Sequence, residues 1–136
     1  MLWDQALETG IEEIDDRNRE LFSLIDDLMN AEAAAESGKM LSRLGENMRR
    51  NFAEEEGLHE MSGYPLAEPH RRAHNGFIVA LLRAERRMMA EGPTLENLLA
   101  FNCSVVDGLR RHVLTGDMEF ADYRGQTSKA RPFWPA

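Results

Sequence analysis

The chain has 136 residues, one cysteine, 24 Asp and Glu against 16 Lys and Arg, and a formal net charge of −8. Its length fits a single compact domain, and the acidic balance argues against nucleic acids and anionic membranes as partners, because both are bound through clustered Lys and Arg. The N-terminal segment lacks the pattern of a signal peptide, and no apolar run approaches the ~20 residues of a membrane span. Cys103 has no partner for an internal disulfide. We therefore expect a cytoplasmic protein.

The hydrophobic pattern is helical throughout, because apolar residues recur every three to four positions and no stretch alternates with the period of two that strands require. We expect a short arm over residues 1–11, a first helix that ends near Gly38, a second over 39–62, a third over 67–91 and a fourth that begins at Pro93. The predicted fold is all-α, an antiparallel up-down-up-down four-helix bundle with an N-terminal arm. The bundle domain is expected to span residues 1–123, followed by a partly frayed tail over 124–136.

Three of the four histidines form a candidate metal site. His70 and His74 are four residues apart and so lie on one face of a helix, where two imidazoles can reach one ion. His112 is followed five residues later by Asp117. On a straight helix these two side chains would point about 140° apart, so both face the core only if the helix bulges, which Gly116 makes easier. The alternative is that Asp117 lies in solvent beyond the helix end.

The second helix carries three polar residues on an otherwise apolar stripe. Asn51, Glu55 and His59 are spaced by four, together with Met48 and Phe52. A carboxylate in a protein core needs a counter-charge or a metal, and the sequence offers Glu55 no evident core arginine. Either this stripe binds metal, or it lies at a wet end of the bundle.

A family resemblance follows from the order of several motifs. They are Leu2-Trp3, Gly10-Ile11, Ile14-Asp15, Asn18-Arg19-Glu20-Leu21-Phe22, Asn51-Phe52-Ala53-Glu54-Glu55-Glu56, Gly63-Tyr64-Pro65, His70-x-x-x-His74 and His112-x-x-x-x-Asp117. With this order and spacing, residues 1–123 resemble the bacteriohemerythrins. The resemblance implies a bundle that holds two irons, bridged by a Glu, an Asp and an oxygen, and that binds O₂ reversibly. By position it implies that Glu55 and Asp117 are the bridging carboxylates and that His70, His74 and His112 ligate one iron.

The chain departs from that family where the second iron would bind. Asn18 and Asn51 stand in place of the two histidines that hold this iron, and an amide oxygen is a weak ligand for Fe²⁺. We therefore expect a single metal ion and impaired reversible O₂ carriage. Iron is the expected ion, with manganese or zinc as alternatives, because the ligand types alone do not separate these metals.

Two further departures affect the expected function. His59 replaces a family methionine one turn after Glu55, where it either ligates the remaining ion or faces solvent. Gly108 replaces a family tryptophan and opens space, unless a neighbour such as Phe101 or Trp134 fills it.

We expect a non-haem metal protein that acts as a sensor or redox protein and binds a small diatomic or other small molecule. One alternative is a metal-dependent enzyme that acts on a small substrate or a reactive oxygen species in the pocket opened by Gly108, Asn18 and Asn51. Another is a degenerate bundle that binds a protein partner. The predicted metal ligands are Glu55, His59, His70, His74, His112 and Asp117.

Overall fold

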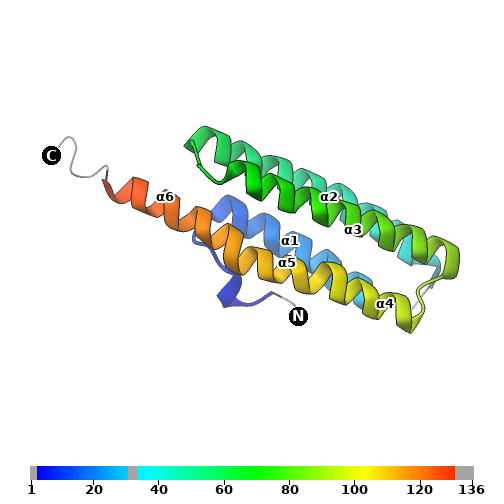
Figure 1. Cartoon of the computed structure of the whole chain (residues 1–136). Coiled ribbons are helices and arrows are strands. Elements are labelled where there is room, and N and C mark those ends of the chain that lie inside the picture. Colours follow the sequence, from blue (N-terminus) through cyan, green and yellow to red (C-terminus); the bar gives the residue numbers. More distant parts are fainter. Residues whose placement is uncertain (1–2, 31–33, 131–136) are drawn as a thin grey trace.

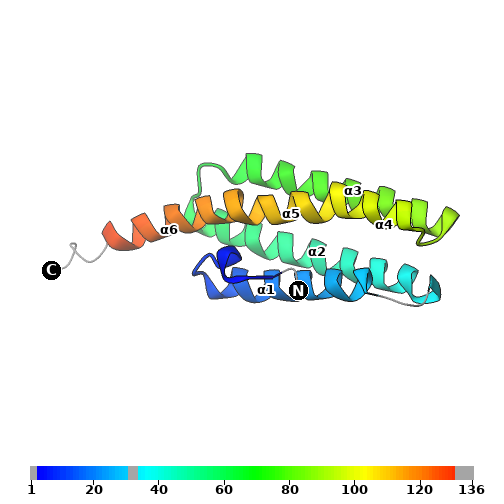
Figure 2. The same ribbon diagram turned by 90° about the horizontal axis from the view of Figure 1, so that it is seen from below.

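Four helical segments pack side by side and antiparallel in the computed structural model, which describes residues 3–30 and 34–130 (Figures 1 and 2). The first three are α1 (Glu12–Met29), α2 (Ala34–Ser62) and α3 (Ala67–Glu91). The fourth is a continuous rod of α4 (Leu95–Phe101), α5 (Asp107–His112) and α6 (Met118–Ala130), joined by two π-helical segments, η2 (Asn102–Val106) and η3 (Val113–Asp117). The described residues contain no strand. The predicted all-α four-helix bundle is confirmed.

Two of the three predicted helix breaks are correct. Gly63 and Gly92 follow α2 and α3 with φ of 64° and 86°, a left-handed conformation that glycine adopts without strain. The break at Gly38 is wrong, because Gly38 is an exposed residue inside α2. The first helix instead ends at Met29, where the Asn30 side chain donates a hydrogen bond to the carbonyl of Asp26. A single glycine costs a helix only about 1 kcal/mol, too little to end one whose apolar face is packed.

The core is built from the apolar stripes of all four helical segments. It contains Leu21, Phe22, Ile25, Leu28, Leu41, Leu44, Met48, Phe52, Leu81, Met88, Phe101, Val105, Val106, Leu109 and Val113. A second, smaller cluster of Ile14, Tyr64 and Phe120 closes one end of the bundle. The polar cluster described below lies within the same bundle, so its surroundings are largely dry.

The predicted N-terminal arm is present, and it packs along the bundle. Its one-turn helix η1 (Gln5–Leu7) buries Leu7 completely, and the ring of Trp3 lies 6.0 Å from that of Phe22. Asp15 in α1 accepts hydrogen bonds from the backbone N–H and the hydroxyl of Thr9 and from the N–H of Gly10. These bonds fix the arm against the start of α1.

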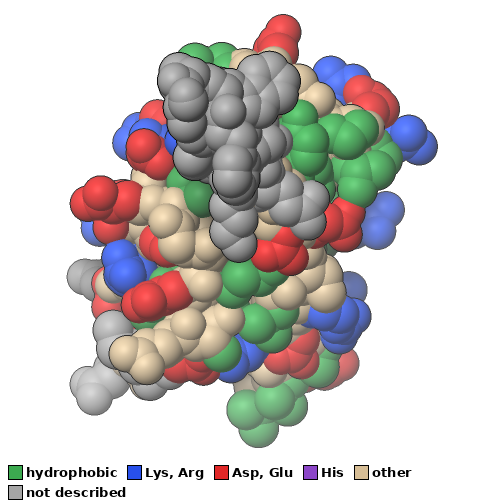
Figure 3. Space-filling model, turned by 90° about the vertical axis from the view of Figure 1, so that its left-hand side faces the viewer, with side chains coloured by type: hydrophobic (Ala, Val, Ile, Leu, Met, Phe, Trp, Pro, Cys, Tyr) green, Lys and Arg blue, Asp and Glu red, His purple; other side chains and the backbone are tan. Residues whose placement is uncertain are grey.

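The last helix continues further than the sequence indicated. The expected tail began at Arg124, but α6 runs on to Ala130 and extends beyond the turn between α2 and α3 (Figure 1). Residues 131–136 of the expected tail, including Trp134, lie outside the described residues. On the face of the molecule that Figure 3 shows, acidic and basic side chains are interspersed, and no histidine side chain is seen among the coloured atoms. No helix in the described part of the chain is long and apolar enough to cross a membrane.

Candidate metal centre

Five side chains from three helical segments converge at one place in the bundle. Each offers one ligand atom, and these atoms all lie within 4.8 Å of one another. Glu55 comes from α2, and His70 and His74 come from α3, while His112 is the last residue of α5 and Asp117 the last residue of η3. His112 is half-buried and the other four are buried. The structure thus brings together five of the six predicted ligands.

The contacts within the cluster are short. Glu55 Oε1 lies 2.5 Å from His70 Nε2 and 3.1 Å from His74 Nε2. Asp117 Oδ1 lies 3.3 Å from His70 Nε2 and 3.4 Å from His112 Nε2, and the last two nitrogens are 3.0 Å apart. All three histidines therefore present the same ring nitrogen to the two carboxylates.

Several of these atoms lack the hydrogen bonds that buried polar groups normally make. Among the described residues, no hydrogen-bond partner satisfies Glu55 Oε1, His74 Nε2 or Asp117 Oδ1. Buried polar atoms without partners are costly and therefore rare. A metal ion would satisfy all three at once, and imidazoles with carboxylates suit Fe²⁺, Mn²⁺ and Zn²⁺. The residues present fit a metal.

The π-helical segment η3 is what turns Asp117 toward the histidines. The sequence predicted that the five-residue spacing from His112 to Asp117 needs a bulged helix, and η3 spans Val113–Asp117. The Thr115 hydroxyl donates to the carbonyl of Arg111 at 2.8 Å, so this carbonyl has a partner beside the widened turn. The alternative that Asp117 lies in solvent is wrong, because its exposed fraction is 2%.

Gly116 is required by the close approach of two imidazoles. A Cβ at this position would lie 3.1 Å from Cε1 of His112 and 3.3 Å from Cε1 of His70. Both distances are below ordinary van der Waals contact. The glycine therefore makes room for two of the candidate ligands, in addition to easing the bulge.

A carboxylate and an aromatic ring hold His74 in place. Glu56 Oε2 lies 2.9 Å from His74 Nδ1, and the Phe52 ring stacks on the imidazole with centroids 3.9 Å apart. A carboxylate on the far nitrogen of a metal-binding histidine fixes its tautomer and raises its basicity. Sequence reasoning gave Glu56 no role, although its position directly after Glu55 was the available signal.

The two asparagines at the positions where the resemblance implies histidine are buried and bonded to each other. Asn51 Nδ2 donates to Asn18 Oδ1 at 3.2 Å, and Asn18 Nδ2 donates to Asp117 Oδ2 at 3.0 Å. These two bonds form an amide relay that runs from α2 through α1 to the fourth helical segment. The relay engages one oxygen of Asp117, Oδ2, in a hydrogen bond. The other oxygen, Oδ1, faces His70 and His112.

Burial and mutual charge shift the pKa values of the cluster in opposite directions. Burial opposes ionisation of Glu55, yet the adjacent imidazoles of His70 and His74 hold its pKa well below the usual range. Burial also opposes protonation of His70, but Asp117 and Glu55 raise its pKa to about 9. Burial and the charge of Glu55 raise the pKa of Asp117 to about 7, while burial and the nearby imidazoles lower that of His112 to about 3.

The structure also corrects two alternatives considered for the second helix. The wet-end alternative is wrong, because the exposed fractions of Asn51 and Glu55 are both 3% and that of His59 is 0%. For the same reason His59 does not face solvent. Its Nε2 lies 4.0 Å from Glu55 Oε1, beside the five converging residues. Ligation by His59 stays a prediction.

The space expected at Gly108 is occupied. A Cβ on Gly108 would lie 3.1 Å from Cε1 of Phe77, so this ring of α3 packs directly against the glycine. The sequence suggested Phe101 or Trp134 as the filling residue. Phe101 belongs to the core. An opened pocket at this point is therefore not part of the site.

Known proteins with similar sequences are consistent with a metal-binding role for the five converging residues. No protein-family model matches the chain. It is 28% identical over 125 residues to the bacteriohemerythrin of Stenotrophomonas maltophilia strain R551-3, covering 90% of this chain and 80% of that protein. This chain is similar to bacteriohemerythrins. The bacteriohemerythrin of Pseudomonas aeruginosa strain LESB58 is likewise 28% identical over 106 residues, which are 74% of this chain and 69% of that protein. The similarity thus extends over most of the chain, including the part that carries the five converging residues.

Proposed function

We propose that this chain is a hemerythrin-like protein that binds one metal ion, with iron as the preferred ion, through Glu55, His70, His74, His112 and Asp117. The observation that carries the proposal is the convergence of five ligand atoms within 4.8 Å of one another, three of them buried without a hydrogen-bond partner. The similarity to bacteriohemerythrins supports iron among the metals that this donor set accepts.

The amide relay supports one ion rather than two. A carboxylate that bridges two ions offers one oxygen to each. In this chain Asp117 Oδ2 accepts a hydrogen bond from Asn18, which leaves Oδ1 for the histidine cluster. Asn18 in turn is held by Asn51. The two positions at which the resemblance expects histidine thus stabilise the first site instead of building a second.

A site of this kind is suited to binding a small diatomic or other small molecule, or to electron transfer, rather than to reversible O₂ carriage. The bound ion would supply redox chemistry and a coordination position, and the protein supplies a dry pocket and fixed ligands. The enzyme alternative relied on space at Gly108, which Phe77 fills. A sensor or redox role is therefore the function we favour.

The test is the metal content of protein purified without added metal. Mass spectrometry of the eluted metal should find about one ion per chain, mostly iron, and gas titration of the reduced protein should show no reversible O₂ uptake. Two tightly bound irons per chain, or reversible uptake of one O₂, would refute the proposal. If no metal is bound and a chelator leaves the melting curve unchanged, the degenerate bundle becomes the better description.

A further inference from the structure

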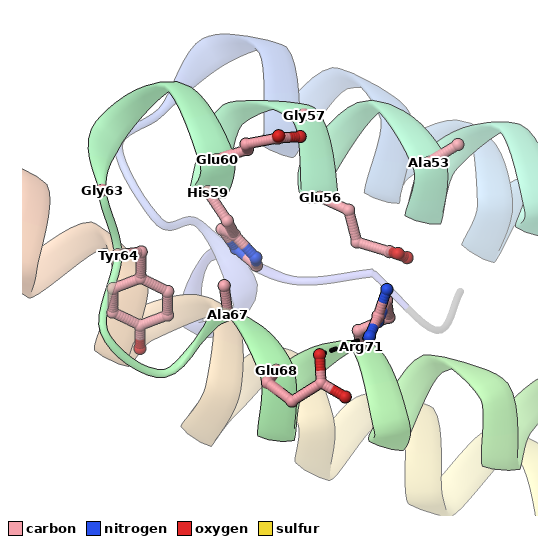
Figure 4. A pocket seen from close by; sticks show the side chains of 10 residues that line it. All are labelled: Ala53, Glu56, Gly57, His59, Glu60, Gly63, Tyr64, Ala67, Glu68 and Arg71. Carbon is pink, nitrogen blue, oxygen red and sulfur yellow. Dashed lines mark hydrogen bonds and ion pairs between the residues drawn. The ribbon is translucent and has the colours of Figure 1, made fainter.

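A cleft opens on the surface next to the metal centre, between the end of α2 and the start of α3 (Figure 4). Its volume is about 480 Å³. The residues that line it are Ala53, Glu56, Gly57, His59, Glu60, Gly63, Tyr64, Ala67, Glu68 and Arg71. None of these is one of the five converging residues, but two of them contact that set.

The first contact is made by Glu56. Its carboxylate lies on the cleft wall and is 29% exposed, while its Oε2 reaches His74 Nδ1. The second is made by His59, whose ring projects from α2 into the space between the two helices (Figure 4). The edge of that ring lies 4.0 Å from Glu55 Oε1. His59 therefore lies both on the wall of the cleft and beside Glu55 of the metal centre.

His59 is unusual because nothing explains its burial. It is fully buried, and neither ring nitrogen has a hydrogen-bond partner among the described residues. Its neighbours are the rings of Tyr64, His70 and Phe120, with centroids 5.1, 4.4 and 4.4 Å away. An imidazole in aromatic surroundings with both nitrogens unsatisfied costs stability, and an apolar side chain would fill the same space without that cost.

The charges at the cleft favour a cation. Three carboxylates line it, those of Glu56, Glu60 and Glu68, against the single guanidinium of Arg71. Arg71 is paired with Glu68, as the dashed line in Figure 4 marks, so the remaining charge is that of Glu56 and Glu60. A concave surface with one sign of charge concentrates small ions of the opposite sign and accelerates their binding.

Resting on the proposed function, we propose that this cleft is the route by which a divalent metal ion enters the buried cluster, with His59 as a transient ligand on the way. The ion is attracted by Glu56 and Glu60 and exchanges a water ligand for an imidazole nitrogen of His59. It is then passed to Glu55 Oε1, which lies 4.0 Å from His59 Nε2. The oxidation state of the ion does not change during this transfer. The same neutral imidazole suits Fe²⁺, Mn²⁺ and Co²⁺.

The test is the rate of metal loading. Metal-free protein prepared with a chelator is mixed with Co²⁺ in a stopped-flow instrument, and the visible absorption of bound Co²⁺ is followed. His59→Met should slow loading about tenfold while the final amount and the affinity of bound Co²⁺ stay unchanged, because the five resident ligands remain. His59→Gln, which keeps a polar side chain, serves as a second variant, and circular dichroism checks that both are folded.

The carboxylates at the mouth supply an independent arm of the test. Glu60→Gln should slow loading several-fold at low ionic strength, with the effect disappearing in high salt, because long-range attraction is screened. The matched control is Glu96→Gln, an exposed carboxylate in the first turn of α4, which should load as the unchanged protein does.

Three outcomes would overturn the entry route. Loading rates that are unchanged in both His59 variants would show that the ion enters elsewhere. A lower affinity with an unchanged loading rate would make His59 a resident ligand. Equal effects of Glu60→Gln and Glu96→Gln would show that only net charge matters. By contrast, failure of the unchanged protein to bind any Co²⁺ would refute the proposed function itself.

Discussion

The replacement of Asn18 by alanine tests whether the amide relay organises the metal centre. Asn18 is the middle member of the relay, since it accepts from Asn51 Nδ2 and donates to Asp117 Oδ2. Asn18→Ala removes both bonds at once, whereas Asn51→Ala removes only the first. The exposed Asn75 in α3 offers a matched control for the change of residue type.

The expected losses follow from the kind of bond that each change removes. A hydrogen bond to a charged acceptor contributes about 1.5–3 kcal/mol and one between neutral groups about 1 kcal/mol. Asn18→Ala should therefore lower the free energy of unfolding by about 3 kcal/mol and Asn51→Ala by about 1 kcal/mol. The double variant should be no less stable than Asn18→Ala, which gives a coupling energy of about 1 kcal/mol. Asn75→Ala should stay within about 0.5 kcal/mol of the unchanged protein.

Two assays separate stability from metal binding. Urea unfolding of the chelator-treated variants, followed by circular dichroism, measures the free energy of unfolding. Competition with a chromogenic chelator measures metal affinity, which Asn18→Ala should lower about 10- to 100-fold because Asp117 loses the partner that orients it. If Asn18→Ala costs no more stability than Asn75→Ala and leaves metal affinity unchanged, the relay has no such role.

Four further changes test other parts of the site. Gly116→Ala should lower metal affinity at least about tenfold by displacing His70 and His112, while Gly76→Ala, which has open space around it, should leave a chelator competition unchanged. Removal of metal with a chelator should lower the melting temperature by about 10–20 °C in calorimetry if the ion is present at ~1,000 times its dissociation constant; coincident curves would contradict a structural contribution. Asn18→His combined with Asn51→His should recover a second ion per chain, whereas each single change should leave the metal content at one, and an unchanged count in the double variant would show that the bridging geometry is lost. Acidification should release metal, since protons compete for the imidazole nitrogens, and dialysis at stepped pH measures this; metal content that stays unchanged through the acidic range would contradict ligation by histidine.

Much of the fold could be predicted because it depends on local signals. The spacing of apolar residues predicts the helices. Gly63 and Gly92 predict two of the turns, because glycine adopts the positive φ of these turns without help from tertiary contacts. The error at Gly38 has the opposite cause. Whether a helix continues through a glycine depends on the packing of its neighbours, and α2 as a whole packs against both α1 and α3.

The placement of a site residue could be predicted where it depends on the geometry of a single helix. It could not be predicted where it depends on how several helices pack together. His70 and His74 share a face by their spacing, and the five-residue step from His112 to Asp117 already required a bulge. The bond from Asn18 to Asp117 joins two residues that are 99 positions apart in sequence, so it depends on how two different helical segments are rotated against each other. The same holds for Phe77, which fills the space beside Gly108 from another helix.

The π-helical segments also constrain how the gene for this protein can change. Each fits one extra residue into a helical turn. Every side chain after it is therefore rotated by roughly 100° relative to its place in a straight α-helix of the same sequence. Beyond η3, Phe120 packs 4.4 Å from His59, and the Tyr123 hydroxyl donates to the carbonyl of Ser62. Deleting a single codon between His112 and Asp117 would leave these two residues four apart, a spacing at which a straight α-helix places both on one face, so the bulge would be lost while Asp117 and the end of α6 keep their orientation. A codon lost between Met118 and Asp122 has no bulge to absorb it and would turn every later side chain of α6 by about 100°, which would move the Tyr123 hydroxyl away from the carbonyl of Ser62.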